Sequence, residues 1–135
     1  RRLLAPYDCI AGRRVRIGGD DIAVNSVAVT SLSLVFHELA TNATKHGALA
    51  AAEGSVEINC RRSGAIFYVT WKEGGAQTPC VSDRSGFGSK LLHLVMEKQL
   101  SGHMVHYPEA DGLRIELDFP CSSVAADEIS RKKTN

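Results

Sequence analysis

The sequence has no long hydrophobic run, and this absence argues against a membrane-spanning chain. A transmembrane helix needs about 20 consecutive apolar residues, and the apolar runs in these 135 residues are far shorter. The first six residues, Arg1 to Pro6, also lack the apolar core of a signal peptide. We therefore expect a cytoplasmic location and no membrane contact by this domain.

An excess of charge of one sign is absent as well. Sixteen Lys and Arg residues stand against fifteen Asp and Glu, so the formal net charge is +1 at pH 7. A chain without a strong field of one sign has little means to attract nucleic acid or an anionic lipid surface. We expect neither among its partners.

Closely spaced cysteines are missing too. No two of the four form a C-x-x-C pair, and a chain that is 44% hydrophobic can build a core unaided. We expect reduced, structural thiols at Cys9, Cys60, Cys80 and Cys121. His103 and His106 have an H-x-x-H spacing, but their segment alternates like a strand, in which residues three apart face opposite sides. This argues against a metal site there.

Apolar residues at helical spacing predict two helices. The first is expected over residues 26 to 46, with Gly47 as its stop. Its apolar face comprises Leu32, Phe36, Leu39, Ala40 and Ala43. The second is expected to run from Gly88 to Ser101 and Gly102. Its apolar face comprises Leu91, Leu92, Val95, Met96 and Leu100.

Alternation of apolar and polar residues predicts two β-hairpins, at residues 56–71 and 103–119. Two briefer strands, 15–17 and 22–24, flank a turn of Gly and Asp. The strand pairs are interleaved with two helices and do not alternate with them one by one. The predicted fold is therefore an α/β two-layer sandwich, with a mixed β-sheet covered on one face by helices.

Two segments lack any apolar period. Residues 73 to 86 are rich in Gly, Pro, Ser and Asp, and we expect a long mobile loop that acts as a lid. From Ser122 onward the residues are small or charged, which predicts a disordered C-terminal tail over 122–135. One domain at 1–121 remains.

The first predicted helix also has a polar face. Glu38, Thr41, Asn42 and Lys45 fall within about one quadrant, opposite the apolar face. A carboxylate base, an amide oxygen for a hard cation and an ammonium group for phosphate suit a magnesium nucleotide. The alternative is a solvated helix face with a ladder of polar contacts, and spacing alone favours that alternative.

Glycines precede the second predicted helix, in the segment Gly86-Phe87-Gly88-Ser89-Lys90. Glycine lets a ligand approach the backbone, and the first amides of a helix are unpaired, so phosphate is the expected ligand. Glycine before a helix is also a common structural element, and the motif alone is weak.

A third segment, Trp71-Lys72-Glu73-Gly74-Gly75, places a carboxylate at the end of a strand. This carboxylate could accept a hydrogen bond from an amine such as that of adenine, and Gly75 leaves space. The alternative is that Trp71 packs in the core while Glu73 is a solvated loop residue.

The three segments together resemble the HWE family of sensor histidine kinases. The matching stretches are H-E-L-A-T-N-A-T-K-H-G-A-L at 37–49, W-K-E at 71–73 and G-F-G-S-K-L-L at 86–92. His37, Trp71 and Glu73 match the residues that give the family its name. L-A-P-Y at 4–7 is also similar to the family's pattern. The resemblance covers about residues 4 to 120.

This resemblance implies a Bergerat-type fold that binds ATP and Mg²⁺. Asn42 would hold Mg²⁺, Lys45 and His46 would contact the phosphates, and Glu38 would be the catalytic residue. Glu73 would bind the adenine amine, with Gly75 making space. The residues closing over the phosphates would be Gly86, Phe87, Gly88, Ser89 and Lys90.

Two departures from the family's pattern are visible. Gly75 is followed by Ala76 and Gln77 in place of the usual proline, which puts the lid conformation in doubt. His46 replaces a more frequent tyrosine, and either ring can lie along a nucleotide.

The implied function is transfer of the γ-phosphoryl group to a histidine on an upstream dimerisation and phosphoacceptor domain. A response regulator would be the partner of the full-length protein. None of the five histidines lies in a recognisable acceptor motif, so we expect little autophosphorylation by this chain alone. The alternative is a nucleotide-binding module that has lost transfer activity and serves in docking or sensing.

Overall fold

Five strands form one mixed sheet in the computed structural model, which describes residues 15–46, 54–75 and 87–125. The strands are β1 (Val15–Gly19), β2 (Ser55–Ser63), β3 (Ile66–Gly74), β4 (His103–Glu109) and β5 (Gly112–Pro120). Their order across the sheet is β1-β2-β3-β5-β4. β1 pairs in parallel with β2, and the other neighbours are antiparallel.

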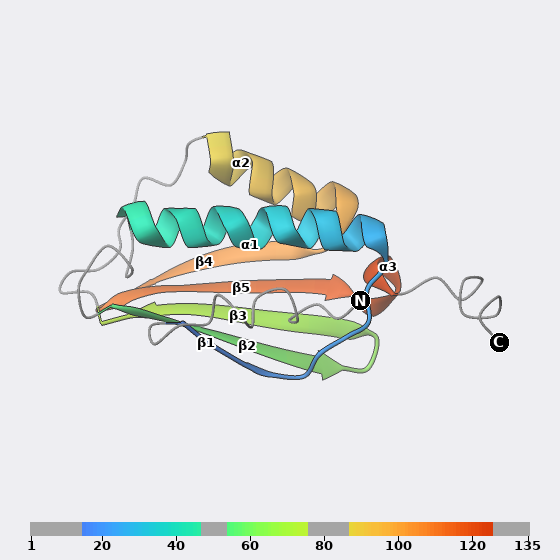
Figure 1. Ribbon diagram of the computed structural model, residues 1–135, viewed down its shortest axis with the longest axis horizontal. Coiled ribbons are helices and arrows are strands. Elements are labelled where there is room, and N and C mark those ends of the chain that lie inside the picture. Colours follow the sequence, from blue (N-terminus) through green and yellow to red (C-terminus); the bar gives the residue numbers. More distant parts are fainter. Residues whose placement is uncertain (1–14, 47–53, 76–86, 126–135) are drawn as a thin grey trace.

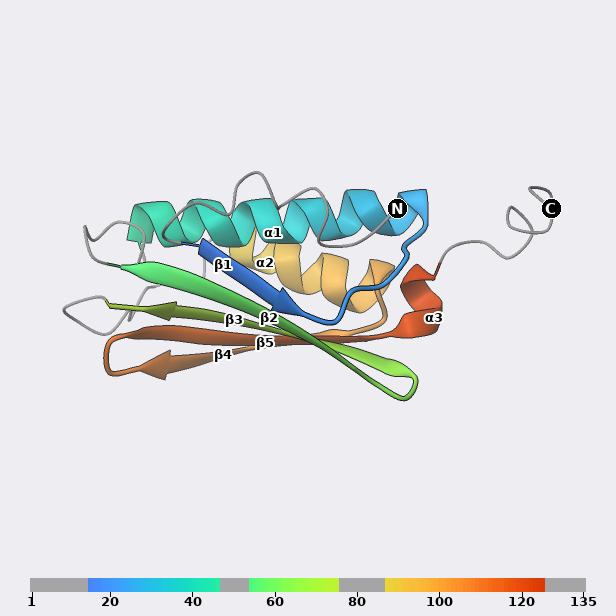
Figure 2. The same cartoon turned by 60° about the horizontal axis from the view of Figure 1, so that its bottom comes forward.

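The helices cover one face of this sheet (Figures 1 and 2). They are α1 (Ser26–His46), α2 (Phe87–Leu94), its π-helical continuation η3 (Val95–Gln99) and the short α3 (Cys121–Val124). The predicted two-layer architecture and the bounds predicted for the first helix are confirmed. Gly47, the predicted stop, lies outside the described residues. No helix in the described part of the chain is long and apolar enough to cross a membrane.

The period of two along β3 and β5 builds the core. In β3, Phe67, Val69 and Trp71 face the helices and are buried, while Tyr68 and Lys72 point to the outer face. The inner residues of β5 complete the layer: Leu113, Ile115, Leu117 and Phe119. The inner face of β3 and β5 is thus apolar throughout, except at Glu73.

The predicted hairpins are present, with shifted ends. β3 continues to Gly74, so Glu73 is a strand residue and not the first residue of a loop. The turn between β2 and β3 centres on Gly64, whose φ of 58° suits glycine. The predicted loop therefore starts later than residue 73, and residues 76–86 lie outside the described part of the chain.

The prediction of a brief strand at 22–24 is wrong. Asp21 Oδ1 accepts a hydrogen bond from the Ile22 amide (2.7 Å), and Asn25 Oδ1 accepts one from the Ala28 amide (2.8 Å). Asn25 is therefore the N-cap of α1. Ile22 and Val24 are apolar because they are buried beside this helix start, and Val24 makes only an isolated bridge to Ala125.

Residues 121–125 also differ from the prediction, which began a frayed tail at Ser122. Cys121 and Val124 of α3 are buried. Asn25 donates its amide hydrogen to Val124 O (2.8 Å) and its Nδ2 hydrogen to Ala125 O (3.1 Å). We call Asn25, Val124 and Ala125 the α1–α3 clamp. Residues 126–135 lie outside the described part of the chain.

The second predicted helix is confirmed to end where expected. Its last turn is wider than an α-helical one: Gly102 N donates to Met96 O (2.8 Å) and Leu100 N to Val95 O (3.2 Å). Gly102 then lies against β5, and a Cβ on it would lie 2.0 Å from Asp118 O. Only glycine allows this approach of helix end and strand.

Cys60 and Cys121 are buried, free thiols, while Cys9 and Cys80 lie outside the described residues. His103 and His106 face opposite sides of β4, as the alternation predicted. The exposed His103 contacts Asp118 at 3.0 Å, and His106 lies 5.9 Å from the His93 ring on the helix side.

Burial gives the stability of the fold a measurable pH dependence. Burial, with smaller contributions from Asp21 and Asp20, raises the pKa of Cys60 from 9.0 to about 12. The folded chain thus holds this proton more tightly than the unfolded chain. The resulting stabilisation is complete below pH 9 and is lost as the pH rises toward 12. We expect Cys60→Ala to remove this loss.

Urea unfolding between about pH 8 and pH 11 measures this pH-dependent loss of stability. The free energy of unfolding should fall with pH more steeply in the parent than in Cys60→Ala, by up to about 1.4 kcal/mol per pH unit above pH 9. The alanine variant serves as its own control at pH 8. There its free energy of unfolding should differ from that of the parent only through the cavity that the missing sulfur leaves. Parallel curves would contradict the assignment.

Candidate functional site

The elements that carry the three predicted motifs have their motif ends toward the same side of the molecule. The C-terminal half of α1, the last residues of β3 and the start of α2 all lie toward the left in Figure 1. β3 returns toward this side because it runs antiparallel to β2. α2 then packs beside α1 in the helix layer. The ends of elements that are far apart in sequence therefore lie toward the same side of the molecule.

The polar face of α1 contributes to this edge. Glu38 and Asn42 lie one turn apart and are half-buried, while Lys45 is exposed. The prediction had set these residues opposite the apolar face. They flank it instead, because Ala28 and Val35 are also buried and widen the apolar face on that side.

Neighbouring positions on α1 are described only in part. His37, the first residue of the family signature, is exposed, and its carbonyl oxygen accepts a hydrogen bond from Thr41 Oγ1 (2.9 Å). The Thr41 hydroxyl is therefore engaged within the helix. His46 is the last residue of α1, and its side chain lies outside the described residues.

The phosphate motif begins α2. Phe87 is the first helical residue, so the backbone of Phe87, Gly88 and Ser89 forms the first turn, whose amides lack intrahelical partners. Lys90 is exposed. The side chains of Phe87 and Ser89, together with Gly86 and the lid predicted at 76–85, lie outside the described residues.

Glu73 is the most unusual residue of the site. Its side chain is fully buried (0% exposed), and Trp71 Nε1 donates a hydrogen bond to Glu73 Oε2 at 2.9 Å. The carboxylate lies at the end of a strand, as predicted, and the alternative interpretation was half right: Trp71 does pack in the core, but Glu73 is neither solvated nor in a loop. Residues two apart in a strand face the same side, which places indole and carboxylate together.

The neighbouring strands hold Glu73 between apolar residues. Val56 of β2 and Leu113 of β5 are its partners in register, and both are buried. The start of β5 also comes close: a Cβ on Gly112 would lie 1.8 Å from Glu73 O. A carboxylate in such surroundings must be hydrogen-bonded, and the Trp71 indole supplies one donor.

Gly75 ends the described part of this segment. Its φ of 79° is one that other residues rarely adopt. Its amide donates to Asp111 Oδ2 in the β4–β5 turn at 3.4 Å. Gly74 lies close to the same carboxylate, since a Cβ there would be 3.7 Å from Asp111 Oδ2. The β4–β5 turn thus supports the backbone that follows Glu73.

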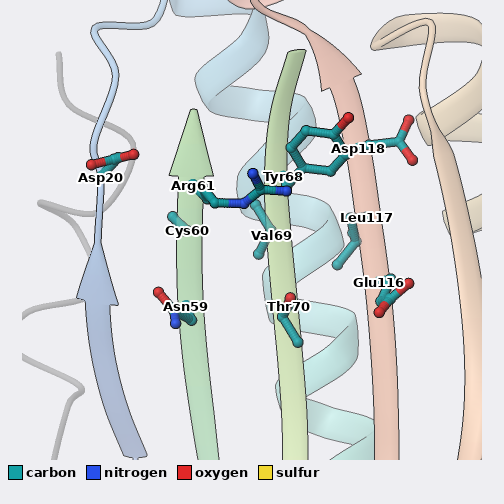
Figure 3. A pocket seen from close by; sticks show the side chains of 10 residues that line it. All are labelled: Asp20, Asn59, Cys60, Arg61, Tyr68, Val69, Thr70, Glu116, Leu117 and Asp118. Carbon is teal, nitrogen blue, oxygen red and sulfur yellow. The ribbon is translucent and has the colours of Figure 1, made fainter. Parts of the chain in front are cut away.

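A hollow of about 560 Å³ on the outer face of the sheet is a separate feature (Figure 3). It lies over β2, β3 and β5 on the side away from α1, where the Arg61 guanidinium carbon is 4.8 Å from the Tyr68 ring centroid. None of the described residues that line it belongs to the predicted nucleotide site. The candidate site is therefore the one that the motifs predict, at the C-terminal ends of α1 and β3 and at the start of α2.

Comparisons with known proteins find relatives that are named blue-light-activated histidine kinases. The chain is 40% identical over 122 residues to a blue-light-activated histidine kinase of Rhizobium johnstonii, a match that covers 89% of this chain and 34% of that protein. Over most of its length the chain is thus similar to one part of proteins that are named histidine kinases. These names are consistent with the HWE-family resemblance at His37, Trp71 and Glu73. No family model matches the chain.

Solved structures show the same fold. The histidine kinase domain of the Erythrobacter litoralis EL346 blue-light activated histidine kinase has a TM-score of 0.69 at 22% identity, covering 87% of this chain and 57% of that one. The histidine kinase ThkA, in complex with the response regulator protein TrrA, has a TM-score of 0.63 at 12% identity, covering 90% and 39%. The chain spans about a third of the length of the first curated relative.

Sequence reasoning missed two contributors to the candidate site. Asp111 and Gly112 were interpreted only as turn residues, although one accepts the Gly75 amide hydrogen and the other lies against the Glu73 backbone. The antiparallel pairing of β3 with β5 brings them there. No local pattern announces such a long-range contact.

Proposed function

We propose that this kinase domain binds Mg-ATP and transfers its γ-phosphoryl group to a histidine on another domain of the full-length protein. The observation that supports this most directly is the buried Glu73 carboxylate at the end of β3. A buried carboxylate is costly unless it has a task or a full set of partners. Here it lies at the same end of the molecule as the polar face of α1 and the first turn of α2.

Glu73 is the residue proposed to bind adenine. A carboxylate only accepts hydrogen bonds, so it suits the exocyclic amine of adenine, which only donates. The apolar partners Val56 and Leu113 on either side lower the local polarity and strengthen such a bond. Gly75, without a side chain, leaves room beside the purine.

The phosphates are proposed to lie between α1 and the start of α2. Asn42 offers an amide oxygen, which is a suitable ligand for Mg²⁺, and the exposed Lys45 offers a positive charge one turn nearer the helix end. His46 follows directly. On the other side, the first-turn amides of α2 suit anionic oxygens, with Gly86, Phe87, Gly88, Ser89 and Lys90 forming that segment. Bound Mg²⁺ would neutralise phosphate charge.

Glu38 is the proposed catalytic residue. It lies one helical turn before Asn42, on the same side of α1 and half-buried. At that position a carboxylate can orient the attacking nitrogen or accept its proton as the phosphoryl group arrives. Positioning and charge stabilisation are the main catalytic contributions in phosphoryl transfer.

The partners follow from the chemistry and from the relatives. Since the transfer needs an acceptor nitrogen, we propose a phosphoacceptor and dimerisation domain elsewhere in the full-length protein, and a response regulator that takes the phosphoryl group onward. ThkA, with the same fold, is known in complex with such a regulator. A module without transfer activity is not favoured, because the relatives are named histidine kinases.

Glu38→Gln tests the proposal. The variant keeps the size of the side chain and removes its basicity. In calorimetric titration we expect Mg-ATP to bind within about twofold of the parent, while phosphoryl transfer to the acceptor domain, added as a separate protein, slows by about 10²–10⁴-fold. Failure of the parent to bind Mg-ATP would contradict the proposed function. Unchanged transfer by Glu38→Gln would contradict the role of Glu38 alone.

A further inference from the structure

We propose that Trp71 is a positioning residue, whose indole N–H fixes the Glu73 carboxylate in the orientation that reads the adenine amine. This inference rests on the proposed function. It assigns the selectivity of the site to a pair of residues, and Glu73 alone would not give it.

The first observation is the geometry of the pair. Trp71 and Glu73 occupy alternate positions of β3 and therefore share its inner face. The indole Nε1 donates to Glu73 Oε2 at 2.9 Å, and this hydrogen bond is buried. The donor and the acceptor come from the same strand, so their spacing is set by the strand itself and does not depend on a loop.

The second observation is that Trp71 cannot easily reorient. It is 3% exposed and lies between Ile58 of β2 and Ile115 of β5 in the sheet register, both of them buried. A large ring enclosed by β-branched neighbours has few alternative rotamers. Its N–H is therefore a fixed donor, and a fixed donor can hold a flexible acceptor.

The third observation concerns the acceptor. Glutamate has three rotatable side-chain bonds, so its carboxylate would sample several positions if nothing held it. A charge-assisted hydrogen bond in low-polarity surroundings is strong enough to select one of them. With Oε2 held by the indole, the position of this oxygen is set before a nucleotide arrives.

The chemistry then predicts selectivity. A carboxylate held in this way faces a purine with acceptors only, so it favours an amino group and disfavours the carbonyl that guanine carries at the equivalent position. Loss of the indole N–H should leave the carboxylate present but less well placed. The preference for the amino group should fall, while contacts to the triphosphate should change little.

Trp71 is the only tryptophan of the chain, which permits a clean test. Biosynthetic replacement of tryptophan by 3-benzothienylalanine substitutes sulfur for the N–H group at almost unchanged shape. The affinities of Mg-ATP and of magnesium purine riboside triphosphate, which lacks the amine, are measured by calorimetry for both forms. We expect the parent to prefer ATP by about tenfold or more, and the replaced protein to prefer it by less than about threefold.

Two control variants separate positioning from packing. Ile115→Val removes one methyl group beside the indole and keeps the hydrogen bond, so its preference for ATP should equal that of the parent. Glu73→Ala removes the carboxylate, and adding the tryptophan replacement to it should cause no further loss of preference. Thermal unfolding of every form establishes that the compared proteins are folded at the titration temperature.

Each possible result either supports or overturns the positioning role of Trp71. A reduced preference in the replaced protein, with the Ile115→Val value unchanged, supports the inference. An equal preference in parent and replaced protein overturns it while leaving ATP binding by the domain intact. A parent that binds both nucleotides equally overturns the inference together with the adenine-reading role of Glu73. A parent that binds neither nucleotide overturns the proposed function itself, and the inference with it.

Discussion

Asn42→Ala is expected to abolish the magnesium dependence of nucleotide binding while leaving the fold intact. A hard cation needs oxygen ligands, and on the polar face of α1 Asn42 offers the amide oxygen between Glu38 and Lys45. The fold should persist because alanine favours a helix more than asparagine does. Calorimetric titration of ATP with and without Mg²⁺ should show the gain in affinity falling from about 100-fold to near unity.

Thr44→Ala is the matched control for this experiment. Thr44 is an exposed residue of the same helix, and its Oγ1 donates to Ala40 O at 2.9 Å, so the variant also loses one polar group from α1. Its magnesium dependence should equal that of the parent. A full magnesium effect in Asn42→Ala would remove Asn42 from the metal site.

Gly112→Ala should produce the largest loss of stability among single methyl additions to the strands around Glu73. A Cβ there would lie 1.8 Å from Glu73 O and 2.6 Å from the Glu73 carbonyl carbon. Both neighbours are backbone atoms, which cannot turn aside as a side chain can, so β3 and β5 must separate. We expect a loss of about 1–3 kcal/mol or more in the free energy of unfolding, with weaker ATP binding in variants that remain folded.

Gly18→Ala provides the comparison, because a Cβ at Gly18 of β1 would meet no atom within 4 Å. Its unfolding free energy should remain within about 1 kcal/mol of the parent value or increase slightly. Urea unfolding of the two variants side by side measures the difference. Equal stabilities would show that the approach of β5 to Glu73 is looser than these distances imply.

Much of the fold is predictable from local patterns. The bounds of α1 follow from helical periodicity, and both hairpins follow from alternation, because each pattern records which face of an element is buried. The failure at Ile22–Val24 is informative. β-branched residues favour a strand, but here they are buried beside a helix start whose cap uses Asn25. Local composition indicates that a residue is buried, but it does not indicate whether a strand or a helix buries it.

The parallel pairing of β1 with β2 and the order of the sheet could not be predicted in the same way. Val15 pairs in register with Val56, across the whole length of α1. Such a contact depends on how the helix crosses the sheet, and neither segment alone encodes that path.

Part of the candidate site could be predicted from local patterns, and part of it could not. Residue types and spacing on α1 identified Glu38, Asn42 and Lys45 as one set, because they belong to one element. The environment of Glu73 was misjudged, because a carboxylate followed by two glycines is typical of a solvated loop. Its burial becomes apparent only when β3 is extended to Gly74 and β5 is paired beside it.

The α1–α3 clamp has a consequence for biosynthesis. Asn25 Nδ2 and Ala125 O are 100 residues apart in the chain, so this contact cannot form until nearly all of the described domain has left the ribosome. The β2–β3 hairpin, whose strands are close in sequence and end at Gly74, can pair much earlier. A nascent chain that still lacks α3 should therefore carry this paired hairpin beside an α1 whose first turn is not yet bound to α3. Closure of the clamp should then be among the last events of folding.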